Sequence, residues 1–272
     1  MTSINTNAGA LNARLYSLQA GAAQEKAMER LSSGQRVNSA ADDAAGLAVA
    51  GKMESQLRGI NMAIRNNQDG VGLIQTAESG INEIRNMVLR VRELAVQMAN
   101  GIYEDSPDRA NAQLEVTALA NQIDLISTYT RFNDVTLLDG SFTGMNIQAG
   151  NTASETIELS FVDMGQSGLA ITTASVATQG SATTTIGTMD TALQTISQEQ
   201  AKLGSYQNRL QYSVANLTKA SVMTEQALGR IMDADFAAES TNLSKQQILN
   251  QASTAMLAQA NQSKQQLIQL IQ

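Results

Sequence analysis

Apolar residues recur along most of this 272-residue chain at alternating intervals of four and three. This spacing places them on one stripe of an α-helix and is typical of helices that pack along their whole length. A first helix is predicted to end near Gly34, because glycine is common just after helix ends. Its stripe consists of Ile4, Ala8, Leu11, Leu15, Leu18, Ala22 and Leu31.

A second and much longer stripe begins after Asp42 and Asp43, two acids that suit a helix N-terminus. A helix over residues 44–99 would be roughly 80 Å long at ~1.5 Å per residue. Such helices are rare in globular domains and common in coiled coils and fibres. Asn67 and Glu78 are polar breaks in the stripe, which consists of Met53, Leu57, Ile60, Ile64, Val71, Ile74, Ile81, Ile84, Val88, Val91, Ala95 and Met98.

The middle of the chain changes character. A shorter helix is predicted over residues 108–129, with Pro107 suited to its first turn. A β-hairpin is predicted over residues 143–163, where apolar and polar residues alternate. Residues 166–185 are rich in Thr, Ser, Ala and Gly and are predicted to be a surface connection.

The helical spacing returns from Met189 to Ile231, breaks near Asp233, and resumes in an amide-rich final helix. The order of the predicted helices is nearly mirror-symmetric, with a short terminal helix and a long helix on each side of the middle. The simplest packing therefore pairs the two long helices antiparallel. We therefore predict a mainly α fold in which long antiparallel coiled-coil helices form a rod-like shaft with a small β-hairpin. The predicted domains are residues 1–43, 44–232 and 233–272.

The terminal helices have narrow apolar stripes and almost no net charge, so neither can bury a domain core by itself. We expect these stripes to pack against other copies of the chain. The residues predicted to form this polymerisation interface are Leu11, Leu15, Leu18, Leu249, Met256, Leu267 and Leu270.

Composition removes several classes of function. The chain has no Cys and no His, which excludes disulfides, thiolate metal sites and His-dependent catalysis. The net charge of −7 disfavours nucleic acid as a partner. Residues 101–165 hold 10 acids and 2 bases, whereas the flanks are nearly neutral, which suggests that the middle faces solvent and the flanks face protein. No apolar run of 18 residues or cleavable signal pattern occurs, so membrane insertion is not expected and the N-terminus by itself suggests a cytoplasmic protein.

A search for chemical motifs yields no catalytic, cofactor-binding or metal-binding residues. Gly70, Gly72 and Gly80 do not follow a strand, and we interpret them as points of close helix contact rather than a dinucleotide loop. The Thr/Ser-rich connection is either a plain linker or a site of O-linked glycosylation. Its candidate acceptors are Thr172, Thr173, Ser175, Thr178 and Ser181.

The segment LSSGQRVNSAADDAAG at residues 31–46 closely resembles the signature of bacterial flagellins. Further motifs with the same resemblance occur in the family's order and spacing and cover about residues 1–165 and 186–272. They are Ile4–Asn7, Arg90–Gln97, Arg131–Asn133, Ala234–Glu239, Gln247–Ala252 and Leu257–Gln262.

This resemblance implies a minimal flagellin, a non-enzymatic subunit of the extracellular filament used for swimming. In the family, paired terminal helices form the inner tube, long helices form the shaft, and outer domains are inserted where residues 166–185 lie here. The implied partners are further copies of the chain, sister flagellins, an export chaperone, the cap and the hook-junction proteins. Export unfolded through the flagellar type III channel would explain the missing signal peptide.

The resemblance also implies recognition by a host Toll-like receptor. The matching positions are Arg90, Leu94 and Glu115. The family often carries Arg four residues after this Glu, and here that position is Leu119. Ordinary contact with solvent or with another subunit is the alternative role for these residues.

Three alternatives to a flagellin stay open from the sequence. A hook–filament junction protein shares the terminal pattern, although the match at residues 31–46 favours flagellin. An extracellular coiled-coil adhesin would not need its ends for oligomerisation. An enzyme would need an inserted domain, and the chain has no insertion of that size.

Overall fold

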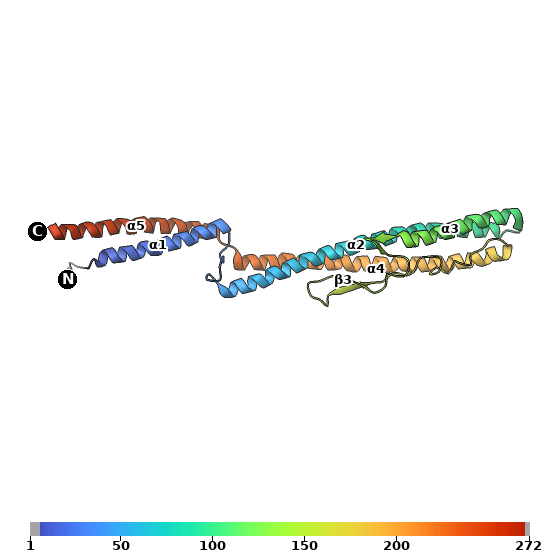
Figure 1. Cartoon of the computed structure of the whole chain (residues 1–272), viewed down its shortest axis with the longest axis horizontal. Coiled ribbons are helices and arrows are strands. Elements are labelled where there is room, and N and C mark those ends of the chain that lie inside the picture. The colour runs from blue at the N-terminus through green and yellow to red at the C-terminus, as the bar shows by residue number, and fades with distance from the viewer. Residues whose placement is uncertain (1–5, 270–272) are drawn as a thin grey trace. The chain divides into compact units, whose positions relative to one another are not determined.

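The computed structural model of the chain describes residues 6–269, with side chains to residue 266. Long helices dominate it and two small antiparallel hairpins complete it, which confirms the predicted fold class (Figure 1). Residues 58–222 form one compact unit, and the parts before and after them form another. The described elements are α1 (Ala8–Ser33), α2 (Ala44–Met98), a π-helical turn (Asp105–Arg109), α3 (Ala110–Tyr129), β1 (Arg131–Phe132), β2 (Val135–Thr136), β3 (Met145–Gln148), β4 (Thr156–Leu159), α4 (Gln179–Met232) and α5 (Phe236–Gln269).

Within residues 58–222, α2 and α4 run antiparallel, as the repeat predicts. The Gln200 side chain donates to Asn82 Oδ1 at 2.8 Å, and Arg92 Nε donates to Asp190 Oδ1 at 2.6 Å. Each step forward along α2 is thus matched by an equal step backward along α4. This register keeps the two apolar stripes facing one another.

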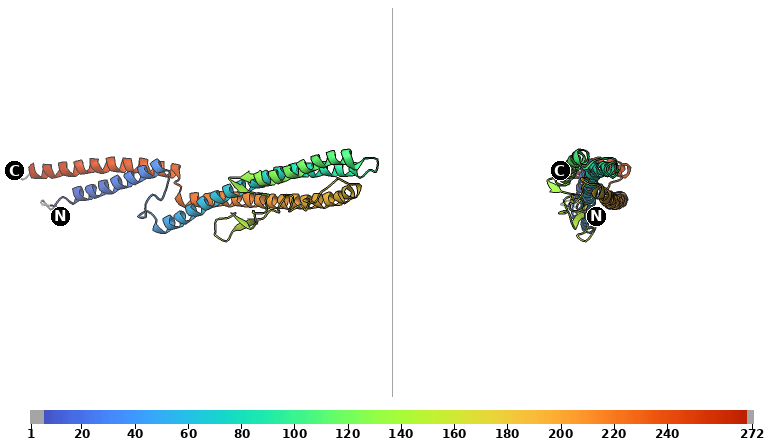
Figure 2. Two further views of the ribbon diagram at one scale, coloured as in Figure 1. Left: turned by 45° about the vertical axis from the view of Figure 1, so that its right-hand side comes forward. Right: turned by 90° about the vertical axis from the view of Figure 1, so that its right-hand side faces the viewer.

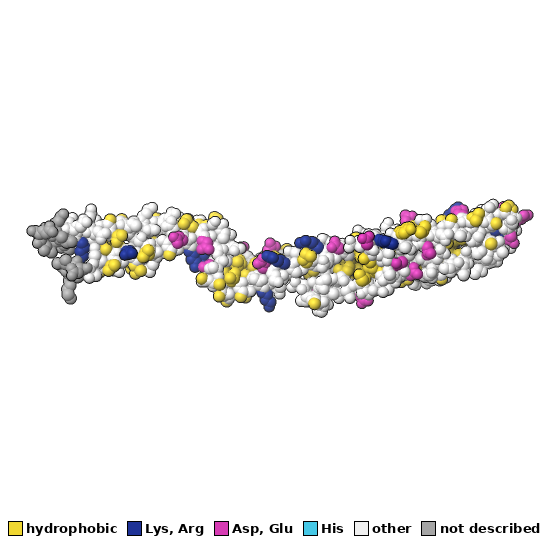
Figure 3. All heavy atoms as spheres, in the orientation of Figure 1, with side chains coloured by type: hydrophobic (Ala, Val, Ile, Leu, Met, Phe, Trp, Pro, Cys, Tyr) yellow, Lys and Arg dark blue, Asp and Glu magenta, His cyan; other side chains and the backbone are white. Residues whose placement is uncertain are grey.

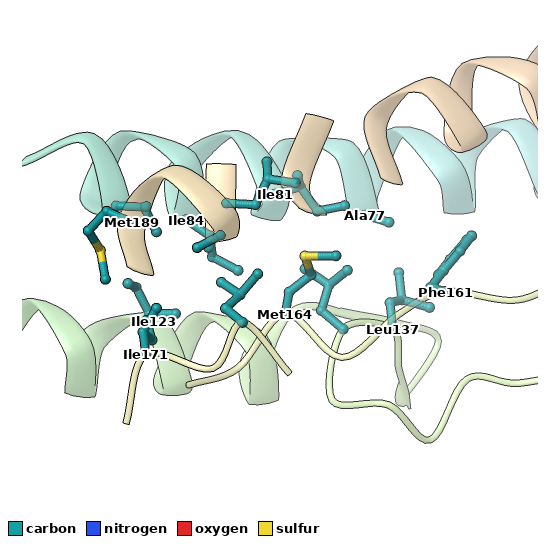
Figure 4. Packing of buried hydrophobic residues seen from close by; sticks show 14 of the residues in the cluster. Ala77, Ile81, Ile84, Ile123, Leu137, Phe161, Met164, Ile171 and Met189 are labelled. Atoms are coloured by element: carbon teal, nitrogen blue, oxygen red, sulfur yellow. The ribbon is translucent and has the colours of Figure 1, made fainter. Parts of the chain in front are cut away.

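The core of this unit lies where α2, α4, α3 and the extended chain after β4 meet (Figure 4). Phe161 stacks on Phe142 with ring centroids 4.7 Å apart, although aromatic residues are scarce in the chain. Burial of this apolar surface supplies most of the favourable free energy of folding. The side chains at its centre are Ile74, Ile81, Ile84, Ile123, Leu137, Leu159, Met164, Met189, Ile196 and Leu203.

Asn67, a polar break in the α2 stripe, is fully buried and fixes the position of the hairpin. Its amide nitrogen donates to the carbonyl oxygen of Ala63 at 2.8 Å and to that of Ala149 at 3.1 Å. Ser213 of α4 also donates to the Ala149 oxygen, at 3.3 Å. One loop carbonyl is thus held by both long helices, which satisfies its need for hydrogen bonds in a buried position.

Two glycines of α2 allow neighbouring segments to approach closely, as predicted. A Cβ at Gly70 would lie 2.5 Å from the Ile147 side chain of β3. One at Gly80 would lie 2.7 Å from the Thr130 hydroxyl and 2.9 Å from Leu138. Gly72 is different, since a Cβ there would make ordinary contact.

The prediction that residues 166–185 form a surface connection was wrong for the second half of this range. Helix α4 already begins at Gln179, and Thr178 and Ser181 cap it reciprocally. The Ser181 amide donates to Thr178 Oγ1 at 3.2 Å, and the Thr178 amide donates to Ser181 Oγ at 3.0 Å. This arrangement is a capping box with Ser in place of the usual Glu. The segment before it also contributes Leu169, Ile171 and Val176 to the core.

The C-terminus of α2 depends on Arg109, a residue that sequence reasoning did not single out. Its side chain is buried and donates to the carbonyl oxygens of Met98 and Asn100, both at 2.9 Å. It also pairs with Asp105 at 2.7 Å. A cation at this end of a helix satisfies free carbonyls and complements the helix dipole.

A second hairpin, β1–β2, also escaped prediction because its strands are only two residues long. Asn133 and Asp134 form its loop with φ of 50° and 63°. Positive φ at both loop positions is the type I′ geometry that suits two-residue hairpins, and Asn and Asp tolerate it better than most residues.

Candidate functional site

The terminal unit is built on an antiparallel pair, α1 and α5, which lie side by side in both views (Figures 1 and 2). The Asn7 side chain of the α1 N-terminus donates to the carbonyl oxygen of Ala260 at 3.1 Å. Further along, Ser17 Oγ donates to Asn250 Oδ1 at 3.2 Å. The advance of ten residues along α1 is matched by an equal retreat along α5, so the pair keeps one register.

Polar residues define the ends of both helices. Asn7 Oδ1 accepts from the Ala10 amide at 3.1 Å, which makes Asn7 the N-cap of α1. Gly34 ends α1 in the left-handed conformation, at φ 72°. Asp235 begins α5 by accepting from the amides of Ala237 and Ala238 at 2.9 and 3.1 Å.

Small side chains form the contact between the two helices. Ala13, Ala20 and Ala27 are the buried residues of α1, and they recur every seven residues. Alanine at the contact lets the two helix axes approach closely but buries little apolar surface. A groove of about 430 Å³ remains beside the seam, lined by Tyr16, Gln19, Ala20, Ala23, Gln246, Leu249 and Ser253.

The leucines of the α1 stripe point away from this seam. Leu11, Leu15 and Leu18 are 57%, 52% and 64% exposed. At about 100° per residue, these three positions lie roughly opposite Ala13 and Ala20 on the helix. These three leucines of the predicted stripe therefore lie away from the contact with α5.

Helix α5 also has exposed apolar side chains. Met256 is 65% exposed, and Leu249, which lines the groove beside the seam, is 43% exposed. The face of the terminal helices seen in Figure 3 has apolar patches with few charged side chains between them. Leu267 lies in α5 but its side chain is not described, and Leu270 lies outside the described residues.

The segment between α1 and α2 is secured by Asp42. One carboxylate oxygen of Asp42 pairs with Lys26 Nζ at 2.5 Å. The other oxygen accepts from the amides of Asn38 and Ser39 at 3.2 and 3.1 Å. These contacts, the Lys26 hydrogen bond foremost, hold the pKa of the Asp42 carboxyl well below its ordinary value of 3.8. Asp42 and Asp43, both predicted to suit the N-terminus of α2, thus have different roles. Asp43 caps α2 by accepting from the Gly46 amide at 2.8 Å.

The same segment closes the end of α4. The Arg36 guanidinium donates to the Ile231 carbonyl oxygen and the Arg36 amide to that of Met232, both at 2.6 Å. The Ala234 amide returns a bond to the Gly34 oxygen at 3.0 Å. These bonds satisfy carbonyls that a helix end otherwise leaves free.

Of the residues matched to a receptor site, the structure brings two together and buries the third. Arg90 contacts Glu115 at 2.8 Å on the exposed surface of α2 and α3. The same Arg90 lies 3.5 Å from Glu93. Leu94 is only 5% exposed because it belongs to the core.

The candidate glycosylation residues also fall into two groups, those with exposed hydroxyls and those whose hydroxyls make hydrogen bonds. Thr172 and Thr173 are exposed, and their hydroxyls make no hydrogen bond within the described part of the chain. Thr178 and Ser181 form the cap of α4, and Ser175 Oγ accepts from the Ala177 amide at 3.3 Å.

The described residues provide neither a cluster of metal ligands nor a membrane-spanning helix. Among residues 6–269, no group of three or more Asp and Glu side chains is placed to hold a metal ion. Within the same range, no helix combines the length and the apolar character needed to cross a membrane.

Comparison with known proteins identifies both ends of the chain. A family model for the bacterial flagellin N-terminal helical region matches residues 4–143, and one for the bacterial flagellin C-terminal helical region matches residues 186–271. A flagellin of Halalkalibacterium halodurans is 41% identical, with 98% of this chain and 99% of that protein covered. The flagellar filament 33 kDa core protein of Treponema phagedenis is 40% identical, with 98% and 99% covered.

Solved structures agree with these matches. Bacillus cereus flagellin has a TM-score of 0.51 and 32% identity, covering 56% of this chain and 88% of its own. A protein of Vibrio parahaemolyticus described as flagellar hook-associated has a TM-score of 0.60, covering 71% and 100%. At 12% identity, the second likeness concerns the fold alone.

Replacement of Asp42 by Asn is expected to lower the melting temperature of the chain at neutral pH. A depressed carboxyl pKa stabilises the fold while the group is ionised, and this contribution is lost as the pH falls through the folded pKa. The difference in melting temperature between wild type and Asp42→Asn should therefore become smaller as the pH is lowered from about 4 to 2, as measured by circular dichroism. Glu25→Gln, an equal charge change at an exposed position of α1, is the control and should leave the neutral-pH melting temperature unchanged. A constant gap at all pH values would contradict the role of the Asp42 charge.

Proposed function

The chain belongs to the bacterial flagellin family, and from that premise we propose that its copies join into a flagellar filament through the outward faces of α1 and α5. It is a structural protein and not an enzyme. The observation that carries the proposal is the exposure of Leu11, Leu15 and Leu18 on the side of α1 opposite its alanine seam.

Energetic reasoning supports this role for the terminal helices. Burial of a leucine side chain contributes about 1.5–3 kcal/mol, so three leucines exposed in the subunit represent a substantial driving force once another copy covers them. Folded monomers rarely leave such a stripe exposed without an interaction partner. Arg14 is the one charged residue of α1 between Ala8 and Gln24, and α5 carries three charged residues between Phe236 and Gln269, so few charges need to be buried with these faces.

We propose that residues 58–222 form the surrounding shaft of the filament. Their paired long helices bury a continuous core within the subunit, so they do not need other copies for that purpose. Most of the 10 acids in residues 101–165 are exposed, which suits a surface that faces water.

The alternatives are less well supported. A hook–filament junction protein would be expected to match hook-associated proteins at least as well as flagellins, yet among the solved structures the sequence identity is 12% to the hook-associated protein and 32% to the flagellin. A coiled-coil adhesin does not account for family matches at both ends of the chain.

We extend the proposal to export and partners. A chain that leaves the cell unfolded through the flagellar type III channel benefits from having no Cys, because no disulfide can block its passage. The family implies an export chaperone, a cap, hook-junction proteins and sister flagellins as partners. Isolation of the chain from sheared extracellular filaments would support this route, and confinement to the cytoplasm would refute it.

Leu15→Gln is expected to weaken polymerisation strongly. Glutamine matches leucine in length and helix propensity but cannot be buried cheaply. The loss of one leucine contact predicts a ~10–100-fold rise in the subunit concentration needed for growth from filament seeds, measured by sedimentation.

Leu15→Met is the matched control, because it keeps an apolar side chain on the same helix. It should polymerise within about threefold of wild type. Both variants should retain the wild-type circular dichroism spectrum, since Leu15 is exposed in the subunit. Normal growth of the Leu15→Gln variant would refute the assembly surface.

Glycosylation, if present, should be found on Thr172 and Thr173 rather than on Thr178 or Ser181. The first two hydroxyls are exposed and unbonded, whereas the last two cap α4. Peptide mass spectrometry of native filaments should locate an added sugar mass that the double variant Thr172→Val/Thr173→Val lacks. A sugar on Ser181 would contradict this assignment.

Recognition by a host Toll-like receptor is proposed to involve Arg90 and Glu115, which form one exposed pair. The buried Leu94 is left out of the proposed contact because it belongs to the core. Glu115→Gln should raise the half-maximal concentration in receptor-reporter cells by ~10-fold, because it removes one charge of the pair. Glu158→Gln, which neutralises an exposed acid on β4, should have no effect. Equal half-maximal concentrations for wild type, Glu115→Gln and Glu158→Gln would exclude Glu115 from the receptor contact.

A further inference from the structure

Methionine provides all the sulfur in this chain, which has 12 Met and no Cys. The thioethers are distributed unevenly between core and surface. Met164 and Met189 are fully buried in the core of residues 58–222. Met256, in contrast, is 65% exposed on α5, on the surface that the previous section assigns to assembly.

We propose that Met256 is an oxidation-sensitive site that controls whether a free subunit can join the filament. The inference rests on the proposed assembly surface and concerns its regulation. The oxidant is a peroxide of the hydrogen peroxide class. The Met256 sulfur donates an electron pair to one peroxide oxygen, the O–O bond breaks, and the leaving hydroxide takes up a proton to form water. The thioether is oxidised by two electrons to the sulfoxide and the peroxide is reduced.

The change in chemistry at this position is large. A thioether is flexible and apolar, and it packs well in irregular apolar surfaces. A sulfoxide is polar and carries a strong acceptor oxygen, so burying it without a donor is unfavourable. Ala252 and Ala260, four residues away on the same face of α5, offer no side-chain donor, whereas Ser253 and Gln259, three residues away, each carry one at the flank of Met256. Oxidation would therefore convert an apolar contact of the assembly surface into a polar one.

Access to the sulfur is expected to depend on assembly. In the free subunit the side chain is open to a peroxide, because methionine oxidation follows exposure. In a filament built through this surface, another copy would cover it. The site would thus reject damaged subunits before incorporation and be protected afterwards.

The test compares purified full-length wild type with Met256→Leu and Met145→Leu. Met145 is 48% exposed on β3, outside the terminal unit, and provides the matched control. Free subunits are treated with hydrogen peroxide, quenched with free methionine, and added to filament seeds. Cleavage after Lys245 and Lys264 releases a peptide in which Met256 is the single methionine, so its oxidation is read directly by mass spectrometry.

Peroxide should raise the subunit concentration needed for growth about tenfold for wild type and for Met145→Leu. For Met256→Leu the concentration needed for growth should change little under the same treatment, because leucine is not oxidised by peroxide. Methionine sulfoxide reductases of both stereospecificities should restore the wild-type protein. An equal rise of this concentration for Met256→Leu and wild type would overturn the proposal and assign the effect to another methionine.

A second measurement separates this inference from the assembly surface itself. Preformed filaments are treated with peroxide, and the oxidation rate of Met256 is compared with its rate in free subunits. Slower oxidation in filaments together with undiminished assembly of oxidised subunits would refute the regulatory role alone. Equal rates in filaments and free subunits would refute both the assembly surface and the inference.

Discussion

A long helix with an apolar stripe needs apolar cover along its whole length, and this constraint governs the arrangement of the chain. Helices α2 and α4 satisfy it within residues 58–222, where α3, the hairpins and the extended chain after β4 complete a shared core. Helices α1 and α5 satisfy it only in part, because their contact is made by alanines. The difference in side-chain size between the two pairs separates a self-sufficient unit from one that needs other copies.

The long helices were predictable because their repeat is strong and continuous. Ile74, Ile81 and Ile84 are buried as their spacing requires, and the antiparallel pairing follows from the symmetry of the plan. The start of α4 was not predictable from composition. Thr183 and Thr184 resemble linker residues, yet each hydroxyl donates to the carbonyl four residues earlier and so remains compatible with a helix. Helix α1 was predicted, but which of its faces meets α5 depends on alanines that carry no strong sequence signal.

Arginine contacts at helix ends were also invisible in the sequence. Arg109 closes α2 after a short loop, and Arg36 closes α4 from a distant part of the chain. In both cases a guanidinium supplies several donors to carbonyls that the helix leaves unpaired. Spacing cannot identify such contacts because they depend on how loops return to the helix. Each of the two long helices therefore ends where another segment holds it.

The alanine seam of α1 has a consequence for how this protein can vary. Its inward positions specify the partner within the subunit, and its outward positions are free of that task. Substitution at Leu15 leaves the internal pairing intact, whereas enlargement of Ala20 would force the helices apart. In the proposed assembly, the contacts within the subunit and the contacts with other copies use opposite sides of α1. Filament strength would then vary through the outward residues while the fold of the subunit stays unaltered.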